Sequence, residues 1–412
     1  MKFRFLIVLG VLLCIDWYFY QSISTVMKNS SDNKKNIAAY LYRGFSIFST
    51  LLILAAVFFN YTSFPKFIRI YCWAIVLVIL LVKIVGCLFI LTDDLIRLFR
   101  WGFSYIPAAD GIEKSHSISR LKFVNQIGLL VAALPFTALI YGMLKGGFDI
   151  RIKKTRLVLP NLPDAFNGLR IVQISDIHCG SFTSIAHFEN AANMIEMQKP
   201  DILFFTGDLV NDLVSETDGF IETFSKMKAP MGTYSSLGNH DYADYITWDS
   251  KEAKAKNLED LKAVHAKVGW RLLLNENVAL ERGGEKIALI GIENWGAKGF
   301  TKYGNLKKAY QGAENYPVKI LLSHDPSHWE AQVLKEYPKI DLTFAGHTHG
   351  MQFGVDLPHF KWSPVKYFYK QWSGLYEQAG QYLYVNQGLG FIGYPGRVGI
   401  LPEITVVELY NA

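Results

Sequence analysis

The stretch Ile171-Val172-Gln173-Ile174-Ser175-Asp176-Ile177-His178 shows the pattern that decides the fold of the C-terminal two thirds of this 412-residue chain. An apolar run, Ile171 to Ile174, ends in a polar tip that carries Asp176 and His178. A second run, Asp201 to Thr206, ends in the same way at Gly207-Asp208. Short apolar runs with polar ends are typical of buried strands in an α/β sheet, so both runs are predicted to be strands.

Three further apolar runs are each followed by a polar block. Because open α/β sheets place their sites outside the carboxyl ends of the strands, these blocks are expected to meet. Glycines beside the polar residues let the backbone turn sharply there. The blocks are Gly238-Asn239-His240-Asp241 after Thr233 to Leu237, Ser323-His324-Asp325 after Lys319 to Leu322, and Gly346-His347-Thr348-His349-Gly350 after Leu342 to Ala345.

The residue types in these blocks are those of a metal site. Asp, Asn and His without a thiolate suit Mn, Fe, Zn or Co and argue against a structural zinc site built from cysteines. Two metals about 3.5 to 4 Å apart need a carboxylate that bridges them, and such a pair suits phosphoester hydrolysis. Asp208 is the candidate bridge.

The ordered blocks resemble the signature of the calcineurin-like metallophosphoesterase superfamily: Asp-x-His, Gly-Asp, Gly-Asn-His-Asp/Glu, an isolated His, then Gly-His-x-His. The resemblance implies a four-layer α/β/β/α sandwich. It also implies two divalent metal ions, one held by Asp176, His178, Asp208 and His349, the other by Asp208, Asn239, His324 and His347. His240 would stabilise the transition state or protonate the leaving oxygen, and Asp241 would orient its other ring nitrogen.

The resemblance covers residues 150 to 410 and extends to the membrane-associated bacterial branch of the superfamily. That branch commonly has a second glycine after Gly-His-Thr-His-Gly, where this chain has Met351. Because no ligand position changes, only a local effect on the loop is expected.

Other polar residues near the blocks receive less specific predictions. Glu293 and Trp295 follow a predicted strand and are candidate substrate contacts. Cys179 is predicted to be a small buried thiol rather than a ligand. The histidines that match no signature position are predicted to be surface or core residues, with His328 a candidate supporting residue for His324; they are His187, His265, His328 and His359.

The first third of the chain has the composition of a membrane region. Apolar runs at 5 to 20, 44 to 61, 70 to 91 and 124 to 144 have about the length that spans a bilayer, which predicts an all-α region of about four transmembrane helices. Residues 1–146 are therefore assigned to the membrane, 147–163 to a linker with a first strand, and 164–412 to the catalytic domain. Asp16 and Lys83 are charges in this region, interpreted as a structural pair between helices with a functional role as the alternative.

An even number of spans places the N-terminus and the catalytic domain on the same side of the bilayer. The basic residues tie between the two sides, but those on the N-terminal side lie in shorter segments beside the membrane, which favours the cytoplasm. The chain has 42 Lys and Arg and 36 Asp and Glu, with no basic stripe, so no nucleic acid partner is expected.

The segment His359 to Tyr376 combines several aromatic residues with three lysines, which suits a membrane interface. The hypothesis is that this loop, with Trp362 and Trp372, faces the bilayer and admits a phosphorylated lipid head group. The alternative is that its aromatic residues fold over the edge of the sheet.

Together these features predict a membrane-anchored hydrolase in which a hydroxide bridging the two metals attacks a phosphodiester or monoester, including one in a lipid head group. The alternatives are a pyrophosphatase acting on a nucleotide-linked lipid such as UDP-diacylglucosamine, a non-catalytic metal-binding sensor or scaffold, and a transporter with an appended domain. No ligand position is missing, which favours the enzyme.

Overall fold

The computed structural model describes residues 2–58, 64–103 and 117–412. The chain forms two compact units, Met1–Tyr141 and Gly142–Ala412. The predicted span 44 to 61 ends in residues that lie outside the described part of the chain. The break between the units lies between Tyr141 and Gly142, near the end of the fourth long helix.

The first unit is helical. Its helices are α1 (Lys2–Met27), α2 (Asp32–Phe58), α3 (Trp73–Phe103), which is preceded by a short π-helical turn at Ile68–Cys72, and α4 (Ser117–Leu144). Within the described residues three segments are long and apolar enough to cross a bilayer: Asp32–Ala55, Ile68–Phe99 and Gln126–Phe148. The predicted all-α membrane region is confirmed, with three of its helices meeting this criterion.

A polar cluster lies inside this helical unit. Lys83 forms an ion pair with Asp16, and its Nζ also donates to Ser46 Oγ at 3.1 Å. Tyr42 and Ser46 hydroxyls donate to Asp16 Oδ1 at 2.9 Å and 2.7 Å. The predicted Asp16 to Lys83 pair is confirmed, and hydrogen bonds from α2 satisfy the carboxylate, as a charge among apolar helices requires.

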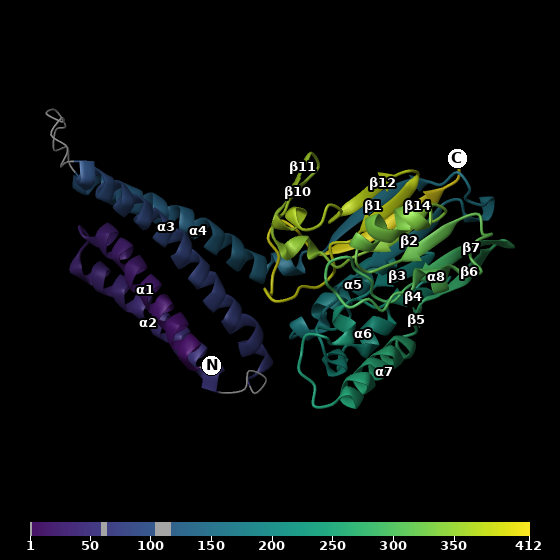
Figure 1. Ribbon diagram of the computed structural model, residues 1–412, viewed down its shortest axis with the longest axis horizontal. Helices are drawn as coiled ribbons and strands as arrows, with labels where there is room; N and C mark the ends of the chain where they lie inside the picture. Colours follow the sequence, from purple (N-terminus) through teal and green to yellow (C-terminus); the bar gives the residue numbers. More distant parts are fainter. Residues whose placement is uncertain (1, 59–63, 104–116) are drawn as a thin grey trace. The chain divides into compact units, whose positions relative to one another are not determined.

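The second unit contains two six-stranded sheets (Figure 1). The first sheet has the order β1 (Arg151–Val158), β14 (Glu403–Tyr410), β2 (Leu169–Ile174), β3 (Ile202–Thr206), β4 (Thr233–Ser236) and β5 (Arg271–Leu272). The second has the order β12 (Gly374–Gln378), β13 (Gln381–Val385), β9 (Leu342–Ala345), β8 (Lys319–Leu322), β7 (Glu285–Gly291) and β6 (Glu276–Arg282). A separate hairpin pairs β10 (Val355–Leu357) with β11 (Phe360–Trp362).

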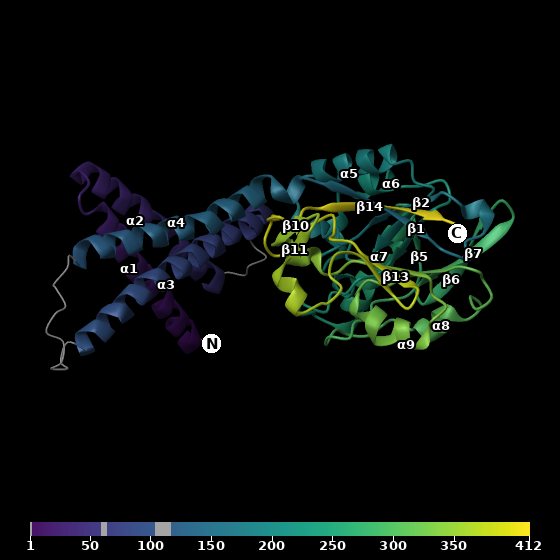
Figure 2. The ribbon, with the colours of Figure 1, turned by 90° about the horizontal axis from the view of Figure 1, so that it is seen from above.

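Helices cover the outer face of each sheet. Helices α5 (Ala186–Met197), α6 (Ile221–Ser225) and α7 (Lys251–Lys267) contribute to the core on the outer face of the first sheet. Helix α8 (Leu306–Tyr310) and the turn that leads into α9 (Leu334–Glu336) contribute to the core on the outer face of the second. Figure 2 shows α5 and α6 on one side of the sheets and α8 and α9 on the other. The predicted four-layer α/β/β/α order is confirmed.

Strand β2 shows how the sequence builds these layers. Side chains alternate between the faces of a strand. Leu169 and Ile171 lie in the core between the two sheets, whereas Val172 and Ile174 lie in the core beneath the helices. Both faces are therefore apolar, and the strand ends where the polar block begins.

Candidate metal centre

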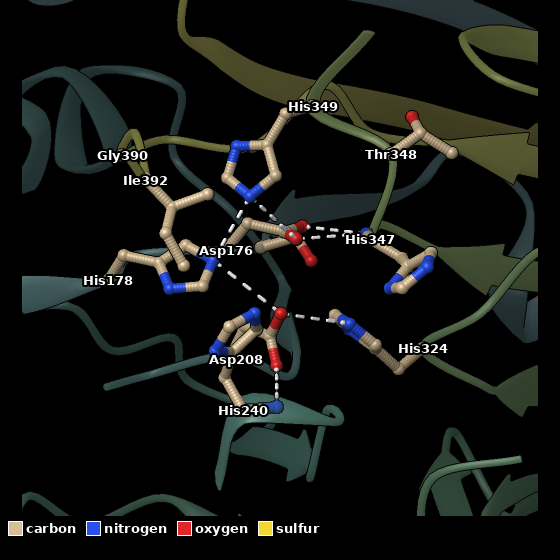
Figure 3. Close-up of polar contacts among 12 residues, drawn as sticks. Asp176, His178, Asp208, His240, His324, His347, Thr348, His349, Gly390 and Ile392 are labelled. Carbon is tan, nitrogen blue, oxygen red and sulfur yellow. Dashed lines mark hydrogen bonds and ion pairs between the residues drawn. The ribbon is translucent and has the colours of Figure 1, made fainter. Parts of the chain in front are cut away.

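The two sheets bring the five polar blocks together at their common edge. Strands β2, β3 and β4 run parallel in the first sheet, and β8 and β9 run parallel in the second. The carboxyl ends of each set therefore lie side by side. His347 N–H in the second sheet donates to Asp176 Oδ1 in the first at 2.9 Å, and His324 Nδ1 donates to the Thr206 carbonyl oxygen at 2.6 Å. These two bonds hold the two halves of the site together, and Figure 3 shows the first of them.

One group of candidate ligands consists of Asp176, His178 and His349, all buried, with ligand atoms within 4.8 Å of one another. The two imidazoles face each other, with 3.0 Å between His178 Nε2 and His349 Nε2. Asp176 Oδ1 is 3.3 Å from His349 Nε2. Two nitrogens and an oxygen thus converge on one point.

A second group consists of Asp208, His324 and His347. Asp208 Oδ2 is 3.2 Å from His324 Nε2, and His347 Nδ1 is 2.8 Å from Asn239 Oδ1. The same Asp208 oxygen is 3.5 Å from His178 Nε2 in the first group. Asp208 therefore faces both groups, which is the position that a bridging carboxylate needs.

The chemistry of these donors fits divalent metal ions. His324 Nδ1 donates to a backbone carbonyl, so its Nε2 carries the lone pair in the neutral ring, as in metal-ligating histidines. That Nε2 lies close to Asp208 Oδ2 and yet has no hydrogen-bond partner within the described part of the chain. A buried ring nitrogen beside a carboxylate, without a hydrogen bond to it, is the arrangement that a bound cation would satisfy.

The charges of the cluster also favour a bound cation. Burial, to which Asp208 adds, raises the pKa of Asp176 to about 6. Burial opposes a charged His324, but the neighbouring Asp208 carboxylate raises its pKa to about 10. Burial lowers the pKa of His178 to about 3, which keeps that imidazole neutral and able to act as a ligand. A positive charge beside the Asp176 and Asp208 carboxylates is therefore favourable in this pocket.

The backbone at these ligands is strained. Asp176, His178, Asp208, His347 and His349 have φ of 51°, 46°, 61°, 72° and 49°. Residues other than glycine rarely adopt these values, and each one costs on the order of 1–3 kcal/mol. Such strain is typical of functional sites, where the surrounding structure fixes the side-chain direction.

Met351 has the same kind of backbone, with φ of 50°, and its side chain is exposed. The glycine that the resemblance favours here would adopt that φ at no steric cost. The methionine therefore changes the local backbone energy and leaves the ligand positions in place.

His240 lies beside the cluster on the turn after β4. Its ring centroid is 5.0 Å from that of His178 and 4.7 Å from that of Tyr245. Its Nδ1 donates to the Asn211 carbonyl oxygen at 2.8 Å. Its Nε2 is therefore the nitrogen that can exchange a proton with a substrate.

The predicted contact between Asp241 and the His240 ring is wrong. Asp241 Oδ2 accepts from the backbone N–H groups of Asp208 (2.9 Å) and Gly238 (2.8 Å), and its Oδ1 accepts from that of Leu209 (2.8 Å). A carboxylate that accepts several backbone N–H groups fixes a turn, and here it fixes the turn that presents Asp208. The Asn211 carbonyl orients the imidazole instead.

The candidate substrate residues do not join the cluster. Glu293 accepts hydrogen bonds from Tyr242 Oη and from Asn275 Nδ2. The Trp295 ring packs against His328, with centroids 4.6 Å apart. Both side chains thus have structural contacts at the ends of β7 and β8.

The histidines outside the blocks are mostly buried. His328 Nδ1 contacts Ser323 Oγ at 2.9 Å rather than His324. His187 and His265 are buried, and His359 is exposed. Cys179 is buried, as expected.

Two residues without a predicted role contact His347. Tyr369 Oη is 2.8 Å from His347 Nε2, and Asp325 Oδ2 is 3.7 Å from the same atom. Asp325 belongs to the quoted Ser-His-Asp block, and Tyr369 to the aromatic segment, but no local pattern pairs either with a histidine on another strand.

A third such residue supports His349. Arg397 Nη2 is 3.0 Å from His349 Nδ1 and also donates to the Gly390 carbonyl oxygen. Burial, followed by the nearby His178 and Arg397, holds the pKa of His349 well below its usual range.

Two family models match this chain. Residues 2–147 match the family model described as "Probable Calcineurin-like phosphoesterase, transmembrane domain", and residues 169–351 match "Calcineurin-like phosphoesterase". A "Transmembrane protein with metallophosphoesterase domain" from Danio rerio is 28% identical over 371 residues, which cover 83% of this chain and 81% of that protein.

Two bacterial proteins are similar to the same degree. The UDP-2,3-diacylglucosamine pyrophosphatase LpxG of Chlamydia trachomatis is 30% identical over 281 residues, which cover 56% of this chain and 81% of that protein. The uncharacterized metallophosphoesterase YkuE of Bacillus subtilis is 29% identical over 254 residues, which cover 60% of this chain and 81% of that protein.

Proposed function

The chain belongs to the calcineurin-like metallophosphoesterases and is a membrane-anchored, metal-dependent phosphoester hydrolase, and we propose that it cleaves a phosphate ester carried by a membrane lipid. The observation that supports a dinuclear centre most directly is the position of Asp208 Oδ2, 3.2 Å from His324 Nε2 and 3.5 Å from His178 Nε2. Two divalent ions, when bound, would supply a nucleophilic hydroxide near neutral pH and offset charge on the phosphoryl oxygens.

The proposed ligand sets share Asp208. One ion is assigned to Asp176, His178, Asp208 and His349, and the other to Asp208, Asn239, His324 and His347. Asp241 holds the Asp208 turn through backbone N–H groups, so it acts on the centre through the backbone.

His240 is proposed as the proton donor to the leaving oxygen. Its Nδ1–H is held by the Asn211 carbonyl, so proton exchange takes place at Nε2. A positioned general acid contributes about 10²- to 10⁴-fold to the rate. His240→Ala should therefore bind both metals and lose about that factor in kcat, and a fully active variant would refute the role.

A second class of substrate is supported by one of the relatives. The similarity to a UDP-2,3-diacylglucosamine pyrophosphatase favours a phosphoanhydride in a nucleotide-linked lipid as the alternative to a simple ester. Both reactions use the same attack on phosphorus, and they differ in the leaving group.

The test is phosphate or nucleotide release by the full chain in detergent from aryl phosphomonoesters, aryl phosphodiesters and a UDP-linked diacylglucosamine, titrated with Mn, Zn, Fe or Co. Asp208→Asn should abolish metal-dependent turnover, and Asp249→Asn, an exposed aspartate, is the matched control. Turnover of one class with the control but not with Asp208→Asn would support the proposal. Two bound metals with no turnover of any class would overturn it.

We further propose that the N-terminus and the catalytic domain face the cytoplasm, on the basis of the basic residues beside the spans. A reporter fused to each end of the chain tests this, since reporters active on opposite sides of the membrane would contradict it.

A further inference from the structure

An exposed apolar surface lies on the segment 351–370, which follows the last metal-ligand block. Four of its large side chains are more than half exposed: Leu357 (56%), Phe360 (57%), Tyr367 (72%) and Phe368 (57%). They belong to the β10–β11 hairpin and the turn after it, and the hairpin projects from the domain in Figure 1. Clustered exposure of this kind marks a surface that contacts a partner or a membrane.

The aromatic segment thus divides into two parts. Trp372 is buried with Val365 and Ile400 in a small core, so that tryptophan does not face the bilayer as the hypothesis required. Trp362 lies in β11 and is half-buried. The exposed members are instead Phe360, Tyr367 and Phe368.

Lysines accompany the apolar residues on this surface. Lys361 lies in β11, Lys366 Nζ sits over the ring of Tyr367, and Lys370 follows three residues later. Aromatic residues next to lysines suit the interface of a bilayer that contains anionic lipids.

The position of this surface along the chain points to the bilayer as its occupant. The last candidate span ends at Phe148, and β1 begins three residues later. Lys153 Nζ in β1 pairs with Asp356 Oδ2 in β10 at 2.6 Å. Five residues reach at most about 17 Å, so the chain itself keeps the hairpin near Phe148, the residue at which the last candidate span ends.

Backbone hydrogen bonds also link the exposed segment to Gly142. Gly142, in the last turn of α4, accepts a hydrogen bond from Arg397 N–H at 3.2 Å. Val398, the residue after Arg397, forms a β-bridge with Phe353, and its carbonyl oxygen accepts a hydrogen bond from Gly354 N–H at 2.9 Å. Within the second unit, the segment that carries the exposed surface is therefore bonded to residues 397–398, and these are bonded to Gly142, the first residue of the unit.

The same segment also reaches the candidate metal centre. Tyr369 Oη contacts His347 Nε2. An open groove of about 550 Å³ is lined by Tyr367, Phe368 and Tyr369, with Lys298 opposite. Tyr369 is shared by the groove and the candidate metal centre, so a head group that enters the groove comes next to the residue that contacts His347.

We propose that the 351–370 surface, defined by Leu357, Phe360, Tyr367, Phe368 and the lysines beside them, docks onto an anionic lipid bilayer and delivers an amphiphilic substrate along the groove. The docking step is independent of the reaction. The delivery step rests on the proposed function.

The first experiment measures docking without activity. A nitroxide is attached at Phe360→Cys in the full chain, in vesicles of phosphatidylcholine with phosphatidylglycerol, after Cys14, Cys72 and Cys87 are replaced by Ala. Collision with oxygen, which partitions into lipid, should exceed collision with a water-soluble nickel chelate. The matched control is Met197→Cys on α5, which is 67% exposed and should show the reverse.

Two outcomes would overturn the docking. Equal exposure of both labels to the nickel chelate would show that the surface faces water. Protection of the Phe360 label from both reagents would show a protein contact, such as a second copy of the chain.

The second experiment tests delivery. Leu357→Glu with Phe360→Glu should lower turnover of a vesicle-borne lipid substrate about tenfold, because the charges oppose entry into the interface, and leave a soluble aryl phosphate unaffected. Met197→Glu is the control. Equal losses on both substrates would refute delivery, whereas an absence of turnover of either substrate by the unaltered chain would count against the proposed function instead.

Discussion

Gly346 lies where the two sheets meet, and the substitution Gly346→Ala tests the geometry of the site. A Cβ at this position would lie 2.2 Å from Asp176 Oδ2 and 2.0 Å from Ser175 Oγ. A Cβ atom essentially never lies within 3.0 Å of such an atom, so the Asp176 carboxylate must move by about 1 Å. The backbone cannot easily yield, because Gly346 N–H donates to the His324 carbonyl oxygen at 2.9 Å.

The expected loss follows from that displacement. A shift of about 1 Å in a catalytic group costs about 10²-fold in rate, and overpacking costs about 1–3 kcal/mol of stability. Gly346→Ala should therefore fold, bind one metal ion tightly and the other weakly, and lose about 10²-fold in kcat. Gly44→Ala on α2, where no atom lies within 4 Å of the added Cβ, is the control.

The assay is aryl phosphate hydrolysis with metal content measured by mass spectrometry on the same sample, and thermal unfolding as the check of folding. A Gly346→Ala protein with two bound metals and unaltered kcat would refute the reasoning, because it would show that Asp176 need not hold its observed position.

Other predictions follow from groups around the site and in the membrane unit. Asp325→Ala removes the carboxylate 3.7 Å from His347 Nε2 and should weaken binding of one metal about 10- to 100-fold, measured by titration with Zn. Burial lowers the pKa of His265 to about 3, so the unfolded chain binds a proton that the folded chain excludes as pH falls below about 6.5, and this residue should lower stability by up to about 1.4 kcal/mol per pH unit; His265→Gln should make the fall in stability between pH 6 and pH 4 shallower by that amount, measured in unfolding curves. Lys83→Met leaves the Asp16 carboxylate unpaired among the helices and should cost about 3–5 kcal/mol, while the double variant with Asp16→Leu should recover much of it; loss of activity in a stably folded double variant would contradict a structural role.

The candidate metal ligands could be recognised from sequence because each of the five polar blocks closely follows a strand. Asp176 comes two residues after β2 and Asp208 two after β3, so strand prediction alone places both at one edge. The two sheets and the membrane helices follow from apolar patterns that are equally local. The family resemblance, the fold class and the hydrolase class were all confirmed on this basis.

The partners of those residues could not be recognised in this way. The family resemblance implied that Asp241 orients the His240 ring, yet the Asp241 carboxylate accepts from the backbone of the Asp208 turn and the Asn211 carbonyl holds the imidazole. Trp372 resembles its exposed neighbours in composition, but it packs beneath Ile400.

The sequence by itself determined which candidate metal ligands lie together, because residues that follow parallel strands lie at the same edge of a sheet. Only the tertiary structure decided how they meet. Tyr369 beside His347, and the positive φ values of five of the candidate ligands, depend on how the turns from two sheets pack against each other. That packing is made by residues far apart in the chain, so a short sequence pattern cannot predict these contacts and backbone angles.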